Sequence, residues 1–177
     1  MSKLLTFRGY LDSADNAREI NRRVFTYESP DLTRAWKVKE FYFWPQTIRA
    51  DTGSTIGEWN LAASLSTDTL GSVPFDDIMN AADNRQIGWV NNGYQHRNSP
   101  ISDFITSESA GLQANRAIID PGHVVNNGLF INFYTTSDSS VSPVRRYNYL
   151  IILEEVKITE NEAILQLVKG VAQDIDN

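Results

Sequence analysis

The chain has 177 residues, of which 41 % are hydrophobic and 11 % aromatic, as expected for one soluble globular domain with its own core. The formal net charge is −6 and the sequence pI is near 4.9, so repulsion of phosphate argues against general nucleic-acid binding. The absence of cysteine excludes disulfides and thiolate metal sites.

The charges are distributed unevenly along the chain. Residues 1–50 hold nine Lys/Arg and six Asp/Glu, whereas residues 51–177 hold seven and sixteen. A mixed solvated surface explains this difference; the alternative is a basic N-terminal face that contacts an acidic partner, such as a neighbouring copy of the protein. The N-terminus lacks the apolar stretch of a signal peptide, and no run approaches the roughly 20 apolar residues of a membrane helix.

The first 35 residues predict two short strands around a helical segment. Aromatic and β-branched residues favour strands at 7–11 and 24–28. Between them, residues 12–23 combine a helix cap with helix-forming residues, although they offer few apolar positions for a buried stripe. Turn residues follow the second strand at 29–31.

Residues 36–44 predict a strand rich in aromatic side chains. With regular alternation, Trp36, Val38 and Tyr42 share one face with Glu40. The opposite face starts with lysines and becomes apolar at Phe41. Proline follows and ends hydrogen bonding on at least one side of the strand.

The middle of the chain predicts short strands separated by turns. Residues 59–66 and 87–90 are strand candidates, and helical spacing of apolar residues predicts a short helix at 75–82. Asn-Asn-Gly at 91–93 predicts a tight hairpin turn, because Asn-Gly tolerates the positive φ of primed turns. Residues 101–105 predict another short strand or a helical turn.

The last third contains further turn signals and one helix. Extended residues 118–119 lead into an Asp-Pro-Gly turn at 120–122, and a second Asn-Gly turn is predicted at 126–128. Residues 159–162 form a capping-box pattern, with Thr followed three residues later by Glu. A short helix is therefore predicted at about residues 160–169.

Two long apolar runs, at residues 129–134 and 147–155, are the best-defined strands of the chain. Both carry apolar side chains on both faces, so they must be central strands of a sandwich or lie buried between layers. The linker between them, 135–146, is expected to be an exposed loop and a candidate contact region. About eight strands at short spacing favour a sandwich or barrel over alternating β-α units.

No residue set in the sequence predicts a catalytic, metal or cofactor site. His96 and His123 lie 27 residues apart and are interpreted as surface or turn residues; a metal site would require them to converge. Glu154 and Glu155 are adjacent on a strand and cannot both line one site without a bulge. Neither a phosphate-binding glycine loop nor a Gly-x-Ser-x-Gly nucleophile motif occurs.

The four tryptophans allow two interpretations. They could form a platform for stacking of sugar rings, or they could lie in the core with one or two at an interface between subunits, where tryptophan is enriched. The second interpretation is preferred. The four residues are Trp36, Trp44, Trp59 and Trp89.

The chain resembles small single jelly-roll coat proteins of viruses over residues 24–158. The resemblance lies in short aromatic-rich strands, Gly/Asn/Pro turns and a small helix between strands, and the late segments HVVNNGLFINFY (123–134) and RRYNYLIILEEVKIT (145–159) fit late strands of such a sandwich. It implies an all-β fold, a single jelly-roll β-sandwich over residues 1–177 with one or two short helices. The chain departs from coat proteins that package a genome by having no dense Arg/Lys arm.

The resemblance implies a structural, non-enzymatic protein without cofactors that forms a symmetric homo-oligomeric shell in a virion, made in the host cytoplasm. Its partners would be other copies of itself and other virion proteins, with little nucleic-acid contact and no membrane. The alternatives are a carbohydrate- or receptor-binding fibre or decoration module, and a β-sandwich or cupin-type enzyme, against which the shortage of histidines argues. The predicted interface residues are Arg22, Arg23, Trp44, Trp59, Trp89, Arg145 and Arg146.

Overall fold

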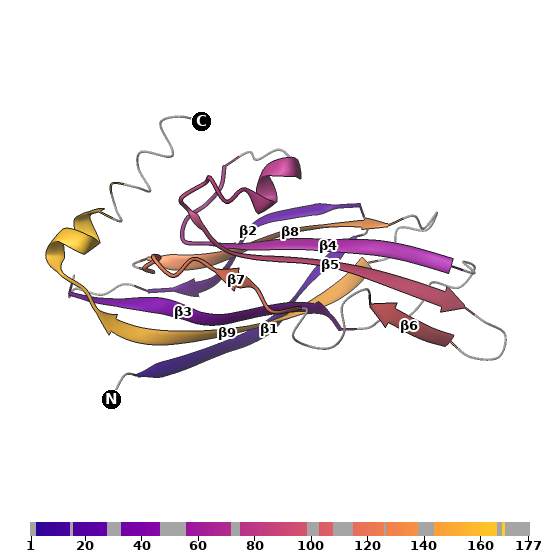
Figure 1. Ribbon diagram of the computed structural model, residues 1–177, viewed down its shortest axis with the longest axis horizontal. Coiled ribbons are helices and arrows are strands. Elements are labelled where there is room, and N and C mark those ends of the chain that lie inside the picture. Colours follow the sequence, from indigo (N-terminus) through magenta and orange to yellow (C-terminus); the bar gives the residue numbers. More distant parts are fainter. Residues whose placement is uncertain are drawn as a thin grey trace.

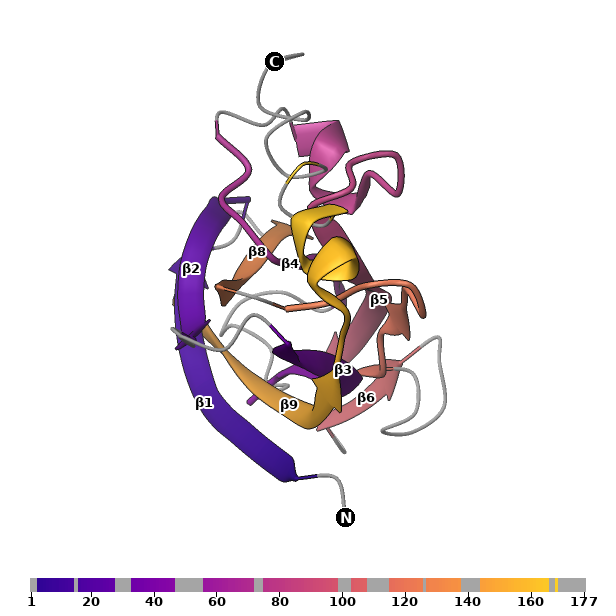
Figure 2. The same cartoon turned by 90° about the vertical axis from the view of Figure 1, so that its left-hand side faces the viewer.

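The computed structural model describes residues 3–14, 16–27, 33–46, 56–71, 75–98, 103–107, 115–125, 127–137, 144–165 and 168. These residues form two antiparallel sheets that face each other across a common core (Figures 1 and 2). The protein is therefore an all-β sandwich, as the sequence predicts.

The smaller sheet has the order β1–β9–β3, and the larger sheet has the order β2–β8–β4–β5–β6, with β7 beside β5. The strands of the smaller sheet are β1 (Leu4–Ala14), β9 (Val144–Lys157) and β3 (Arg34–Pro45). Those of the larger sheet are β2 (Arg18–Thr26), β8 (Gly128–Ser137), β4 (Ile56–Ser66), β5 (Gln86–Asn98), β6 (Asp103–Ser107) and β7 (Ile118–Ile119). The helical elements are the 3₁₀ helix η1 (Phe75–Met79) and a C-terminal helix that includes residues 160–165 and 168.

The strands pair in a nested order. β1 pairs with β9, β2 with β8, and β4 with β5, so the outermost pair joins the first strand to the last. The segment 115–125 runs beside β3, with bridges from Arg116 to Tyr42 and from Val125 to Trp36. Four nested antiparallel pairs divided between two sheets are the strand arrangement of a jelly roll.

The core lies between the sheets and is richest in aromatic rings around the two central strands. Phe133 of β8 lies 5.0 Å from Phe43 and 5.4 Å from Tyr147 of β9, measured between ring centroids. β8 lies between β2 and β4, and β9 lies between β1 and β3. The prediction that these two-sided apolar runs are central strands is therefore confirmed.

A β-bulge in β3 corrects the predicted faces of this strand. Val38 pairs with Leu153, and Glu40 pairs with the adjacent Ile152, so Lys39 is an extra residue without a partner position on β9. The bulge changes the phase of alternation: Trp36 and Val38 before it and Phe41 and Phe43 after it are all buried. The prediction that Tyr42 shares a face with Trp36 was wrong because it assumed regular pleating.

The helix predicted at residues 12–23 is not formed. Asp12 to Ala14 complete β1, and β2 begins at Arg18. Asn16 and Asn21 both have a φ of 58°, a left-handed conformation that asparagine tolerates and that interrupts a right-handed helix. Pairing of both strands with long central strands overrides the local helical preference, which had no apolar stripe to bury.

The hairpin turn predicted at residues 91–93 is also absent, because β5 continues through this segment. Asn91, Asn92 and Gly93 pair with residues 60–62 of β4. The buried Asn92 amide donates to Asn115 Oδ1 at 2.8 Å and to the Tyr94 hydroxyl at 3.1 Å. Asn92 therefore forms hydrogen bonds in the core, and Gly93 continues the strand in place of a turn.

Both helical elements lie at the positions that the sequence predicts. The predicted helix at 75–82 is the shorter η1, and the capping box of the C-terminal helix is formed: the Glu162 amide donates to Thr159 Oγ1 at 3.2 Å, and the Thr159 amide donates to Glu162 Oε2 at 2.7 Å. Asp-Pro-Gly forms the predicted turn at 120–122. The exposed loop predicted at 135–146 is shorter than expected, because pairing extends β8 to Ser137 and begins β9 at Val144, and Thr135 is buried. The remaining loop residues 138–143, and residue 126 of the second Asn-Gly turn, lie outside the described residues.

Phe133→Ala is expected to lower the free energy of unfolding by about 3–5 kcal/mol, because it removes a fully buried ring and leaves a cavity beside Phe43 and Tyr147. Urea denaturation measures this loss. Tyr134→Ala, on the opposite face of β8, is the control and is expected to cost about 1 kcal/mol. Equal losses for the two variants would contradict the assignment of Phe133 to the core.

Candidate interaction surface

The two sheets differ in what covers their outer faces. The helix η1 lies over the larger sheet, where it contacts β4 and β8 (Figure 1). Ser64 and Ser66 on the outer face of β4 are buried. Among the described residues, no element packs on the outer face of β1–β9–β3. The outer face of the smaller sheet is therefore left open by the described residues, whereas η1 covers part of the larger sheet, over β4 and β8.

Apolar side chains run across this open face. In β1, Leu5 and Phe7 pack toward the core, so the alternate residues point outward. Tyr10 has 55 % of its surface exposed. We call the outward apolar residues the outer strip; they are Leu4, Tyr10, Tyr42, Trp44, Leu150 and Ile152.

The outer strip contains a shallow hollow of about 420 Å³, which we call the basin. Tyr10 and Trp44 both pair with Asn148 of β9, one from each side, so they lie roughly 10 Å apart across two strand spacings. An added Cβ at Gly9 would come within 2.6 Å of Tyr149 Oη, so only glycine leaves room for that ring. The basin is lined by Arg8, Gly9, Tyr10, Trp44, Asn148, Tyr149 and Leu150.

An ion pair borders the basin and fixes one of its rings. Arg146 donates to Asp12 through Nε at 2.8 Å and Nη2 at 3.0 Å, and its guanidinium lies 3.9 Å from the centre of the Tyr10 ring. The hydrogen bonds from Arg146 lower the pKa of Asp12, and those to Asp12 raise the pKa of Arg146. Arg8, in contrast, has no ion-pair partner among the described residues, so its charge is available to a ligand.

Further ion pairs surround the strip. Lys39 Nζ lies 3.2 Å from Glu154, and Arg116 lies 3.5 Å from Glu40. The second glutamate of the adjacent pair, Glu155, lies 3.4 Å from Arg34, so the two neighbouring carboxylates have different partners, as their strand positions predict. An apolar centre with a charged border is the usual composition of a protein–protein interface.

The structure brings two of the predicted interface residues together. Trp44 lines the basin, and Arg146 covers the ring of Tyr10 beside it. Arg145 precedes Arg146 on β9 and has a partner of its own. Sequence reasoning missed Arg8, Tyr10 and the β9 residues of the basin, because the predicted strands that contain them did not show that β9 pairs with β1 and β3.

The other predicted interface residues lie on the larger sheet. Arg22 and Arg23 are exposed on its edge strand β2; Arg22 pairs with Glu19 at 3.2 Å, and Arg23 lies over the ring of Phe130 at 5.1 Å. The half-buried Trp89 donates to Gln86 at 3.0 Å. Trp59 belongs to β4, and its side chain lies outside the described part of the structure. Arg22, Arg23 and Trp89 do not line the basin, although the charge of Arg22 helps to lower the pKa of Asp12 at its border.

His123 forms hydrogen bonds within the fold through both ring nitrogens. His123 is only 4 % exposed, so its assignment to a turn is correct and its assignment to the surface is wrong. Its Nε2 accepts the Val38 amide at 2.8 Å, which places the proton on Nδ1, where it is donated to the Asp120 carbonyl. His123 thus stabilises the residue that precedes the bulge of β3. The His96 side chain lies outside the described residues.

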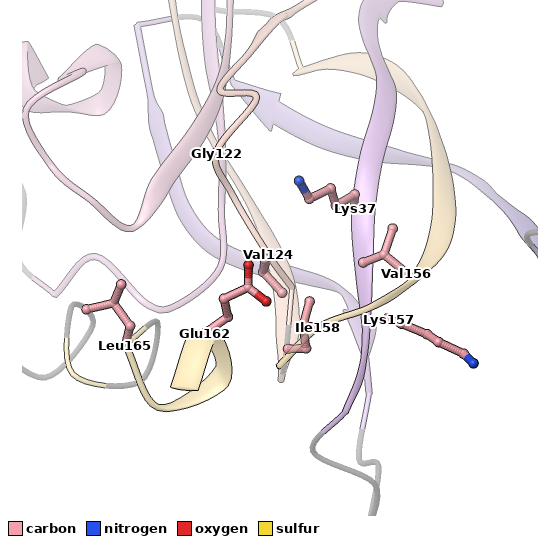
Figure 3. Close-up of a pocket in the computed structure, with 8 residues that line it drawn as sticks. All are labelled: Lys37, Gly122, Val124, Val156, Lys157, Ile158, Glu162 and Leu165. Atoms are coloured by element: carbon pink, nitrogen blue, oxygen red, sulfur yellow. The ribbon is translucent and has the colours of Figure 1, made fainter. Parts of the chain in front are cut away.

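A second hollow, of about 300 Å³, lies where the C-terminal helix meets the ends of β3 and β9 (Figure 3). Glu162 points into it, but its carboxylate already accepts the Thr159 amide and hydroxyl, and these bonds lower the pKa of Glu162. Lys37 donates to the Pro121 carbonyl at 3.3 Å, and Lys157 points away from the hollow. Glu162 and Lys37 are thus already used within the fold, one in the cap of the helix and the other in a contact between β3 and the 120–122 turn.

The part of the chain that the structure describes holds no cluster of three or more metal-binding side chains and no helix long and apolar enough to cross a membrane. No protein-family model matches the chain, and no curated protein matches its sequence. The basin is thus the best candidate functional site, and its chemistry suits binding.

The pH dependence of stability tests the role of His123. Burial lowers the pKa of His123 below its usual value of 6.5, and the charge of Lys37 lowers it further. The carbonyl and the carboxylate of Asp120 oppose this shift but do not cancel it. As the pH falls below 6.5, this histidine is protonated in the unfolded chain before it is protonated in the native state. The free energy of unfolding that neutral His123 contributes therefore decreases as the pH falls below 6.5.

His123→Leu removes both the titrating group and the acceptor of the Val38 amide, and is expected to cost about 1–3 kcal/mol at neutral pH. The difference in unfolding free energy between the two proteins should be largest at pH values above 7 and should narrow in acid. Chemical denaturation at a series of pH values measures it. A difference that is independent of pH would show that His123 is not held neutral by the fold.

Proposed function

We propose that this protein is a structural subunit that assembles with copies of itself into a symmetric shell, as jelly-roll coat proteins of viruses do. The observation that carries the proposal is the contrast between the two outer faces: one is covered by the chain itself, and the other carries the uncovered outer strip. The nested strand pairing supports it by analogy of fold.

The outer strip has the features required for association between copies. Aromatic and aliphatic residues lie at its centre, and burying them would provide the main driving force. Ion pairs such as Arg146 with Asp12 lie around it and would fix the orientation of the neighbour. The site of action under this proposal is the virion, and the net charge of −6 fits a subunit with little genome contact.

The size of the purified protein is the direct test. Light scattering coupled to gel filtration, followed by electron microscopy, should show a large homo-oligomer or closed particle in place of the 20.0 kDa monomer. Assembly should weaken on dilution and with Trp44→Ser, which removes an apolar side chain from the basin. A protein that remains monomeric at high concentration would contradict the proposal.

A second function, carbohydrate binding, is favoured by one feature of the basin. Tyr10 and Trp44 lie on either side of the Asn148 amide, an arrangement in which aromatic rings can stack on a sugar and a polar group can bind its hydroxyls. The described tryptophans do not form the exposed row that such modules are expected to carry, since Trp36 is buried and Trp89 bonds to Gln86.

A glycan array tests this second function. Binding of a defined glycan by a monomer, lost in Trp44→Ser and retained in Ile118→Ser on β7 outside the basin, would replace assembly with carbohydrate recognition as the function of the basin. Under the assembly proposal, no glycan is expected to bind above background, and the array signals of the wild type and of Trp44→Ser should be equal.

A further inference from the structure

The C-terminal helix presents an apolar surface of its own. Ile164 and Leu165 are each 55 % exposed and Val168 is 57 % exposed. At 100° per residue these three side chains lie on one face, which we call the helix knob, while Ala163 is buried on the side toward the sandwich. The capping box at Thr159 fixes where this helix begins.

The helix knob cannot reach the basin of its own chain. The helix starts just after β9 ends at Lys157, at the far end of the sheet from the basin residues 148–150 (Figure 1). Seven or more strand residues separate the two, a distance of roughly 25 Å. The helical residues from 160 to 168 span only about 13 Å. Any contact between knob and basin therefore joins two copies.

The charges beside the two surfaces are complementary. Glu160 is exposed and lies four residues before Ile164, so it shares the face of the helix knob. Arg8 lines the basin without an ion-pair partner among the described residues. The negative charge of Glu160 beside the helix knob is therefore complementary to the positive charge of Arg8 beside the basin.

We propose that the helix knob of one copy docks in the basin of the next, with Glu160 beside Arg8. This inference rests on the proposed assembly and specifies its contact. The two surfaces differ and lie at different ends of the sandwich, so the contact is heterologous: each copy uses its knob on one neighbour and its basin on another. Such a contact propagates into a ring or an open helical filament and does not stop at a two-fold dimer, and a shell requires a further contact between rings.

A complementation experiment tests this arrangement. One variant, Tyr10→Thr with Leu150→Thr, loses the basin but keeps the knob, and the threonines retain strand propensity. The other, Ile164→Gln with Val168→Gln, loses the knob but keeps the basin, and glutamine retains helix propensity. Light scattering should show that each variant alone is monomeric, whereas their mixture forms a species of twice the 20.0 kDa chain mass that grows no further.

Several outcomes distinguish the inference from the proposed function. A wild-type protein that stays monomeric overturns both. If both variants assemble as the wild type does, only the knob–basin contact is overturned. The same holds if the wild type assembles but the mixture of the two variants remains monomeric. Formation of the mixed dimer also shows that both variants are folded. Ile118→Gln, which alters an exposed apolar residue on β7, is the matched control and should assemble as the wild type does.

Charge reversal tests the orientation within the mixed dimer. Arg8→Glu in the basin-bearing variant should raise the dissociation constant about five-fold, as expected for a border ion pair. Adding Glu160→Arg to the knob-bearing variant should return the dissociation constant to its original value. A dissociation constant that does not respond to either change, or that rises further in the double exchange, would overturn the pairing of these two residues.

Discussion

Hydrogen bonding of β9 between β1 and β3 is the contact on which the rest of this fold depends. It joins the first strand of the chain to the last, with Leu4 paired to Glu154 and Ala14 to Val144. The chain has no cysteine, so no covalent link supports this long-range closure. Burial of Tyr147, Ile151 and Leu153 against the opposite sheet must offset the entropy lost when the distant ends of the chain are brought together.

The same closure creates the open surface. With only three strands, the smaller sheet presents one face to the core and leaves the other uncovered among the described residues, while the excursion around η1 covers the larger sheet. A network through Asn132 fixes that cover: it accepts the Asn21 amide at 2.7 Å and donates to Ser66 at 3.0 Å, and Asn21 in turn accepts the Leu70 amide. The asymmetry between the faces is therefore part of the fold and motivates the proposed assembly.

Much of this fold could be predicted from patterns that report burial directly. The apolar runs of β8 and β9 have side chains suited to two buried faces, and they are the central strands. The predictions at residues 12–23 and 91–93 were wrong because local propensity competes with pairing to distant strands, which a single sequence does not reveal. The bulge at Lys39 was missed for a similar reason: it appears only in the register with β9, and the Val38 amide before it bonds to His123, 85 residues away.

The candidate site was less predictable, because it combines residues from three strands whose neighbours the sequence does not specify. Tryptophan enrichment at interfaces pointed to Trp44, but Tyr10, Arg8 and Asn148 join it only through the register of β9 with β1 and β3.

Oxidative footprinting of Tyr10 at increasing protein concentration, read by mass spectrometry, tests most directly whether another copy covers the outer strip. The account predicts that the labelling of this half-exposed ring falls as particles form, while the labelling of Ile118 on β7, outside the basin, does not change. Labelling of Tyr10 that stays constant from monomer to assembled particle would contradict it.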